Sequence, residues 1–183
     1  MQSTVVLLTG PVGSGKTTIA ARIAENPEWV HISEDLLWDE TGHAPQDARD
    51  DEGQVRVHAL AHRYILQAVK DGKNAVLEFL VYENPPFRIA HYQDFLNERN
   101  IEVVTRILVP SRETVIARQK IRGRPTERSE SWSRNYLEHT MRCLSADMIQ
   151  PEWLVDSTDQ TVEETYLQFF SGIVSAASPP RAP

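Results

Sequence analysis

Short apolar runs alternate along the chain with longer segments in which apolar residues recur every three or four positions. The runs predict strands over 4–9, 29–32, 74–81, 102–109 and 153–155. The helical spacing predicts helices over 16–25, 54–70, 86–99, 112–121, 130–148 and 162–175. Strands that alternate with helices of this length indicate an α/β fold, with a parallel sheet covered by helices on both faces.

Three predicted strands contain stretches that are apolar throughout rather than at alternate positions: 5–8, 75–77 and 107–109. That pattern is typical of strands that are buried on both faces of a sheet. Ligands of such sheets bind beyond the carboxyl ends of the strands. Polar residues that directly follow a strand are therefore candidate site residues.

The chain length, 183 residues, fits one domain. We expect a single domain over 1–177, with a lid at about 118–135 and a frayed tail over 178–183. No stretch has the roughly 18 consecutive apolar residues of a membrane span, and the N-terminus lacks a basic signal-like region. The only cysteine, Cys143, lies in an apolar-patterned helix and is interpreted as a core residue. These features predict a cytoplasmic protein without membrane association.

The charge is distributed unevenly along the chain, whose formal net charge is −7. The segment 25–56 holds ten acidic residues and two basic ones, whereas 112–134 holds seven basic residues and three acidic ones. A net negative charge argues against long nucleic acids as partners, because these are bound mainly through phosphate neutralisation. For the acidic segment, a merely solvated surface remains an equal alternative.

Between the first predicted strand and helix the chain reads G-x-x-x-x-G-K-T, the pattern of a phosphate-binding loop. Glycines let the backbone approach phosphate closely, and backbone N–H groups and a helix N-terminus converge there on one anion. Lys16 would reach the β- and γ-phosphates, and the Thr17 hydroxyl would ligate Mg²⁺. The loop therefore predicts binding of a nucleoside triphosphate by Gly10, Pro11, Val12, Gly13, Ser14, Gly15, Lys16, Thr17 and Thr18.

Carboxylates follow two other predicted strands. Asp35 is the candidate that orients and deprotonates an acceptor hydroxyl, with Glu34 as the second choice; the alternative is that one of them caps a following helix. Glu78 ends an otherwise apolar strand, where an unpaired carboxylate would be costly. We expect Glu78 to hold a Mg²⁺-bound water or to contact the acceptor.

A basic segment follows the fourth predicted strand. Arg118 and Arg122 lie one helical turn apart and share a face, and the helix breaks at Gly123. Together with Arg124, these arginines predict a lid that closes over phosphates and stabilises transition-state charge. The alternative is a solvated basic helix. After the last strand, Asp156 lies near the expected nucleotide base or caps the next helix.

Taken together, these positions resemble the small P-loop kinases: chloramphenicol phosphotransferases, gluconate and shikimate kinases, and the AAA-type kinase domains of polynucleotide 5′-kinases. The resemblance runs over about residues 4–175 and rests on the phosphate loop, Asp35, the basic lid and the segment 155–158 before an acidic helix. It implies a three-layer P-loop NTPase fold with sheet order 2-3-1-4-5. It also implies ATP as the donor, and lid arginines as phosphate ligands.

The acceptor is expected in a pocket formed by 35–56, Glu78 and 82–88. Candidate contacts within it are Asp35, Trp38, Glu78, Tyr82 and Arg88. So acidic a rim suits an acceptor rich in hydroxyls, with or without an amine, such as a sugar-containing antibiotic or another metabolite. Polynucleotide kinases tend to carry arginine three residues after the catalytic aspartate, where this chain has Trp38.

The sequence thus predicts an ATP- and Mg²⁺-dependent kinase that phosphorylates a small-molecule hydroxyl, acting as a monomer or homodimer. A polynucleotide 5′-hydroxyl kinase is the alternative among enzymes. A nucleotide-dependent switch that presents a surface to a protein partner is the alternative outside them.

Overall fold

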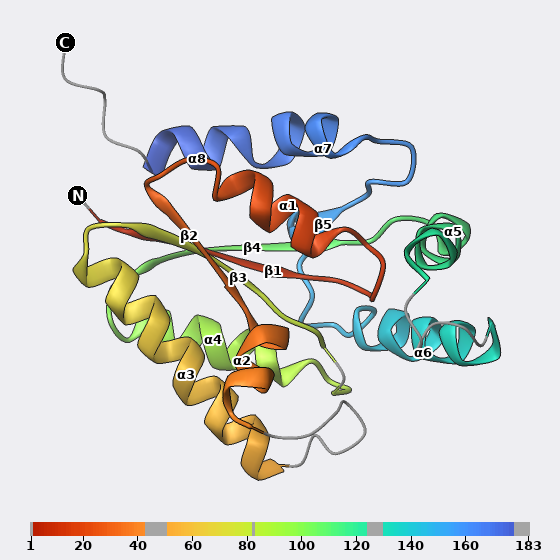
Figure 1. Cartoon of the computed structure of the whole chain (residues 1–183), viewed down its shortest axis with the longest axis horizontal. Coiled ribbons are helices and arrows are strands. Elements are labelled where there is room, and N and C mark those ends of the chain that lie inside the picture. Colours follow the sequence, from red (N-terminus) through yellow and green to blue (C-terminus); the bar gives the residue numbers. More distant parts are fainter. Residues whose placement is uncertain (1, 43–50, 82, 124–129, 178–183) are drawn as a thin grey trace.

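Five parallel strands form one sheet in the order β2–β3–β1–β4–β5, and helices cover both of its faces (Figure 1). The computed structural model describes residues 2–42, 51–81, 83–123 and 130–177. The strands are β1 (Thr4–Thr9), β2 (Trp29–Ser33), β3 (Asn74–Glu78), β4 (Glu102–Leu108) and β5 (Leu154–Val155). The α/β class and the predicted strand order are confirmed.

Successive residues of β1 point into two different apolar cores. Val5 and Leu7 belong to a core shared with α3 (Asp51–Lys70) and α4 (Phe87–Asn97). Val6 and Leu8 belong to a second core. The helices that complete this second core are α1 (Lys16–Ile23), α7 (Val162–Phe169) and α8 (Ser171–Ala177). Every residue of β1 and β3 is buried, as their continuous apolar runs predict.

Two further helices, α5 (Arg112–Arg122) and α6 (Glu130–Cys143), lie at the end of the sheet where β1 leads into α1 (Figure 1). The side chain of Ser111 caps the start of α5 by accepting a hydrogen bond from Thr114 N. The helix ends at Gly123, whose φ of +65° lies in the left-handed region. The predicted break at Gly123 is therefore confirmed.

Residues of three strands align at this edge of the sheet. Leu8 of β1 and Ser33 of β2 both lie opposite Glu78 of β3 in the parallel register. The phosphate loop follows β1, and α2 (Glu34–Glu40) follows β2. The sequence segments predicted to bind the nucleotide and the acceptor thus leave the sheet at the same end, with the end of β3 between them.

Some elements differ from the prediction. The helix α2 was not predicted, because seven residues give too short a periodic pattern. The strand β3 ends at Glu78, although Phe79 and Val81 beyond it stay buried. The last predicted helix is divided at Phe170 into α7 and α8, and the short helix η3 (Pro151–Trp153) precedes β5. Cys143 is buried in the core, as expected. Within the described ranges, no helix combines the length and apolar character needed to cross a membrane.

Candidate functional site

The chain between β1 and α1 makes a tight loop that requires glycine. Gly10 has a φ of +144°, and a Cβ there would lie 2.4 Å from the carbonyl oxygen of Leu108. Gly13 has a φ of +90°, and a Cβ there would lie 2.8 Å from Cγ of Gln119. Both the backbone conformation and the packing therefore exclude larger residues.

The start of α1 is open to an anion. Gly15 occupies the N-cap position, so no side chain accepts hydrogen bonds from the first helical turn. Lys16 is only 8% exposed, and its Nζ donates hydrogen bonds to the carbonyl oxygens of Gly10 and Pro11, at 3.0 Å each. Thr17 is exposed. The loop thus brings uncapped N–H groups, an ammonium and a hydroxyl together, which fits a phosphate chain with its metal ion.

Two side chains of α5 fasten this loop. Gln119 donates from Nε2 to the carbonyl oxygen of Val12, at 2.7 Å. Arg118 donates from Nη1 to the carbonyl oxygen of Ser14, at 3.2 Å, and from Nη2 to that of Ser157, at 3.0 Å. Arg118 therefore links the phosphate loop to the segment after β5.

Arg122 and Arg124, predicted for the lid, and Asp156, predicted near the nucleotide base, are the remaining candidates on the donor side. Arg122 is exposed on α5, and Arg124 lies outside the described residues. Asp156 is exposed, and its Oδ1 accepts a hydrogen bond from Thr158 N at 3.0 Å. The hydroxyl of Thr158 in turn accepts from Ser111 N, at 2.7 Å. Asp156 thus shapes the loop between β5 and α7, close to the carbonyl that Arg118 binds.

Glu78, at the end of β3, is a buried and ionised carboxylate. The Ser33 hydroxyl donates to its Oε1 at 2.6 Å, and His31 Nε2 lies 3.4 Å from the same atom. Burial opposes ionisation, but His31, Ser33 and the Lys16 charge together hold the pKa of Glu78 below its usual range. Among the described residues nothing donates to its buried Oε2. A charged oxygen without a partner beside Lys16 suits a metal-bound water.

The adjacent carboxylates Glu34 and Asp35 lie in different environments. Asp35, the preferred base candidate, is half-buried at the second position of α2. Glu34 is buried, accepts a hydrogen bond of 2.6 Å from the Tyr92 hydroxyl and forms an ion pair with Arg88. Burial raises the pKa of Glu34 to about 7, although Arg88 and Tyr92 work in the opposite direction. Asp35 is therefore the more accessible of the two.

Arg88, a predicted acceptor contact on α4, is the centre of a buried polar cluster. Its Nη1 donates to Glu34 Oε2 at 3.1 Å and to the Leu80 carbonyl oxygen at 2.8 Å. Its Nη2 donates to Gln54 Oε1 at 2.7 Å and to Glu83 Oε1 at 2.6 Å. The Arg88 side chain is 4% exposed. We call Glu34, Gln54, Glu83, Arg88 and Tyr92 the acceptor-side cluster.

Three histidines continue this cluster between α3 and α4. The His58 and His91 rings stack at 4.5 Å between centroids, and those of His91 and His62 at 5.0 Å. Gln54 accepts a hydrogen bond from Arg88 through Oε1, and the distance from its Nε2 to His58 Nε2 is 2.7 Å. Gln54 lies in the segment 35–56 that was expected to form the acceptor pocket, whereas no motif marks the three histidines.

Two predicted acceptor contacts remain. Trp38 is buried in the apolar core beneath α2. Tyr82 lies outside the described residues.

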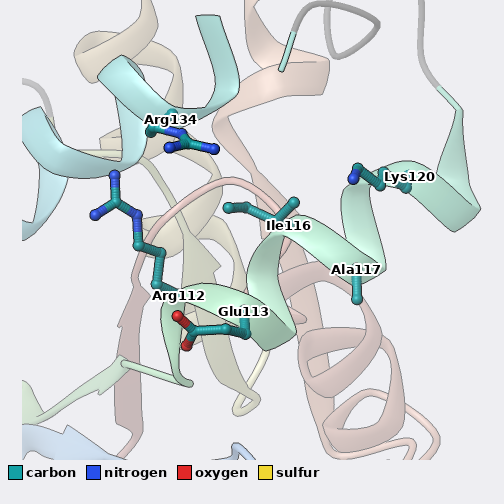
Figure 2. A pocket seen from close by; sticks show the side chains of 6 residues that line it. All are labelled: Arg112, Glu113, Ile116, Ala117, Lys120 and Arg134. Atoms are coloured by element: carbon teal, nitrogen blue, oxygen red, sulfur yellow. The ribbon is translucent and has the colours of Figure 1, made fainter. Parts of the chain in front are cut away.

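A pocket of about 440 Å³ lies between α5 and α6 (Figure 2). Its lining side chains are Arg112, Glu113, Ile116, Ala117, Lys120 and Arg134. They occupy a different face of α5 from Arg118 and Gln119, which contact the phosphate loop. The pocket is therefore separate from the phosphate loop.

The sheet order and the glycine-lysine loop together define a P-loop NTPase-like protein. A family model described as an AAA domain matches residues 5–146, and the chain belongs to that family. Membership implies nucleotide binding. No curated protein sequence matches the chain.

Solved structures share the fold over almost the whole chain, at low sequence identity. The tunicamycin resistance protein of Deinococcus radiodurans is 15% identical, with a TM-score of 0.68 over 94% of this chain and 96% of that one. A gluconokinase from Sinorhizobium meliloti is 17% identical, with a TM-score of 0.63 over 96% and 94%. Shikimate kinase from Acinetobacter baumannii is 20% identical, with a TM-score of 0.59 over 95% and 94%.

Proposed function

We propose that the protein is an ATP-dependent kinase that transfers the γ-phosphoryl group to a hydroxyl of a small molecule. One observation carries the proposal. The phosphate loop with Lys16, the buried carboxylate Glu78 and the accessible carboxylate Asp35 leave the same edge of the sheet. Phosphoryl transfer needs this combination of charge neutralisation and a positioned acceptor.

On the donor side, backbone N–H groups at the start of α1 hold the phosphates. Lys16 exchanges its hydrogen bonds to the Gly10 and Pro11 carbonyl oxygens for contacts to the β- and γ-phosphates. Thr17 would ligate Mg²⁺, and Glu78 would accept a hydrogen bond from a water bound to that ion. The metal ion, when bound, supplies positive charge to the β- and γ-phosphate oxygens. Arg122 and Arg124 contribute further positive charge from the lid.

On the acceptor side, Asp35 accepts the proton of the acceptor hydroxyl. The hydroxyl oxygen forms a bond to the γ-phosphorus while the bond between that phosphorus and the β–γ bridging oxygen breaks. ADP leaves with that bridging oxygen, and the acceptor leaves as a phosphate ester. Arg118 holds the phosphate loop against the segment between β5 and α7, through hydrogen bonds to the carbonyl oxygens of Ser14 and Ser157.

The similar folds include proteins named as a gluconokinase and a shikimate kinase. Those names support a small-molecule hydroxyl as the acceptor of this chain, and its net charge of −7 argues against a polynucleotide.

The test is ATP consumption by the purified protein with Mg²⁺, against separate pools of sugars, nucleosides, hydroxylated antibiotics, hydroxy acids and 5′-hydroxyl oligonucleotides. We expect one small-molecule pool to stimulate ATP consumption and to yield a product heavier by one phosphate. Stimulation by oligonucleotides alone would replace the proposal with a polynucleotide kinase. ATP binding without stimulation by any pool would favour a nucleotide-dependent switch.

A further inference from the structure

The loop after β3 and the start of α4 form one side of the edge at which the acceptor would bind. Arg88 lies there, and an arginine at such a place could in principle bind an acidic acceptor. Both N–H groups of its Nη1 are already donated, to Glu34 and Leu80, and both of its Nη2, to Gln54 and Glu83. A carboxylate or phosphate acceptor that bound Nη1 or Nη2 would have to displace these buried partners, which is costly.

Among the described residues next to this cluster, the His58 and His62 rings do not supply positive charge. Burial, followed by the charges of His91 and Arg88, lowers the pKa of His58 to about 3. Burial and the His91 charge likewise lower the pKa of His62 to about 4. Both rings are therefore neutral at pH 7. In sequence, residues 34–56 contain eight acidic and two basic residues.

Glu83 has a carboxylate oxygen that no other described residue of the cluster contacts by a hydrogen bond. Its Oε1 accepts from Arg88 at 2.6 Å, and within the part of the chain that the structure describes its buried Oε2 accepts no hydrogen bond. Since Arg88 also pairs with Glu34, one cation faces two carboxylates. A carboxylate oxygen that is held in place but lacks a donor is suited to an N–H or O–H group of a ligand.

We infer that the acceptor is a hydroxylated compound that is neutral or carries an amine, rather than a carboxylic or phosphoric acid, and that Glu83 distinguishes the amine-bearing form. The inference rests on the kinase activity proposed above. It separates this chain from the gluconokinase and shikimate kinase whose fold it shares, since gluconate and shikimate are acids. Arg88 is then a positioning residue, which fixes Glu83 without touching the acceptor.

The first test compares compounds that share one carbon skeleton but differ in charge, such as glucose, glucosamine and gluconate, and nucleosides against their monophosphates. Each is incubated with Mg²⁺-ATP, and product is measured by mass and by kcat/KM. We expect kcat/KM at least about tenfold higher for the best neutral or amine form than for the matched acid. A preferred acid overturns the inference and leaves the kinase in place. No product from any compound contradicts the kinase activity itself.

The second test replaces Glu83→Gln, which retains an oxygen for Arg88 but removes the charge. For an amine acceptor we expect kcat/KM to fall by about tenfold or more, because a charge-assisted hydrogen bond is lost. For the matched neutral acceptor, which loses a hydrogen bond but no opposite charge, the fall in kcat/KM should be several-fold smaller. The KM for ATP should stay within about twofold. The control is Glu98→Gln, an exposed glutamate beyond the other end of α4, which should change neither.

Glu83→Asp tests the same role if the glutamine variant folds poorly. It preserves the charge, and the preference for the amine form should persist. Equal losses for amine and neutral acceptors in the glutamine variant would show that Glu83 only supports Arg88.

Discussion

The phosphate loop and the acceptor-side cluster are built from different parts of the chain. The loop uses backbone groups of one continuous segment, with Lys16 as its main side chain. The cluster joins side chains from four segments, with Glu34, Gln54, Glu83 and Arg88 brought together only by folding. A backbone site of this kind leaves a fixed spacing of glycines in the sequence, whereas a side-chain cluster leaves none.

The two regions also differ in where their polar groups are satisfied. At the loop, no side chain caps the first N–H groups of α1, and at the end of β3 no described residue donates to Oε2 of Glu78. In the acceptor-side cluster, Arg88 and Glu34 bind each other inside the protein, and among the described residues Oε2 of Glu83 is the carboxylate oxygen without a donor. We therefore expect substitutions in the loop to reduce activity, and substitutions in the cluster to reduce stability first.

The largest expected effect is on the loop side, in Lys16→Ala. Removing the ammonium that neutralises the γ-phosphate should lower kcat/KM for ATP on the order of a thousandfold, equivalent to about 4 kcal/mol. The urea denaturation midpoint should change little, because Lys16 donates hydrogen bonds to carbonyl oxygens of its own loop, those of Gly10 and Pro11. Lys120→Ala, which removes an exposed lysine of α5, is the control and should keep activity. Normal turnover by a folded Lys16→Ala protein would contradict the proposal that Lys16 neutralises the phosphates of ATP.

The second effect is on the cluster side, in Arg88→Met. This change leaves the Glu34 carboxylate buried without its cation, and it should lower the free energy of unfolding by about 3 kcal/mol. Urea denaturation at pH 7 measures the loss. Arg63→Met provides the control, since Arg63 pairs with Glu40 at the exposed surface of α3. A surface pair of this kind contributes about 1 kcal/mol or less. Equal losses in the two variants would mean that the buried cluster is not special.

The third prediction compares two neighbouring carboxylates, Asp35 and Glu34, as the proton acceptor. Asp35→Asn removes the proton acceptor and should lower kcat about a hundredfold while ATP binding is retained. Glu34→Gln keeps one acceptor oxygen for Arg88, and its amide N–H can donate to the Tyr92 hydroxyl, so kcat should fall less than tenfold. Single-turnover kinetics and ATP titration measure the two quantities separately. The reverse order of effects would make Glu34 the base.

The sequence was sufficient for the parts of the fold that depend on local pattern. Strand β1 has the predicted bounds, and α5 ends at Gly123 as expected. It was not sufficient where burial decides. Trp38 is an aromatic residue that sequence reasoning placed in the acceptor pocket, but it is covered in the core beneath α2. Arg88 was identified as an acceptor-side cation, yet its partners come from residues 34, 54, 80 and 83. No local pattern predicts those pairings.

The last effect concerns pH, and groups of the acceptor side respond to it in opposite directions. Folded His58 and His62 have pKa values of about 3 and about 4, below the ordinary 6.5. When the pH falls from 7 to 5, both histidines become protonated in the unfolded chain but stay neutral in the folded protein. Each ring should therefore cost about 1–2 kcal/mol of stability over this range. Glu34 acts oppositely: its folded pKa of about 7 exceeds the ordinary 4.5, so acidification protonates it in the folded protein first and stabilises the fold.

The double variant His58→Gln/His62→Phe separates these contributions. It removes both titrating imidazole rings and leaves Glu34 in place. Between pH 7 and pH 5, the free energy of unfolding of the double variant should therefore fall by about 2–4 kcal/mol less than that of the natural protein. Glu34→Gln should shift the balance the other way, with a steeper loss of stability on acidification. Urea denaturation at pH 7, 6 and 5 measures all three proteins. If the double variant loses as much stability as the natural protein between pH 7 and 5, the histidine stack is not the acid-sensitive part of the acceptor side. The difference between the two regions would then lie in the Arg88 cluster alone.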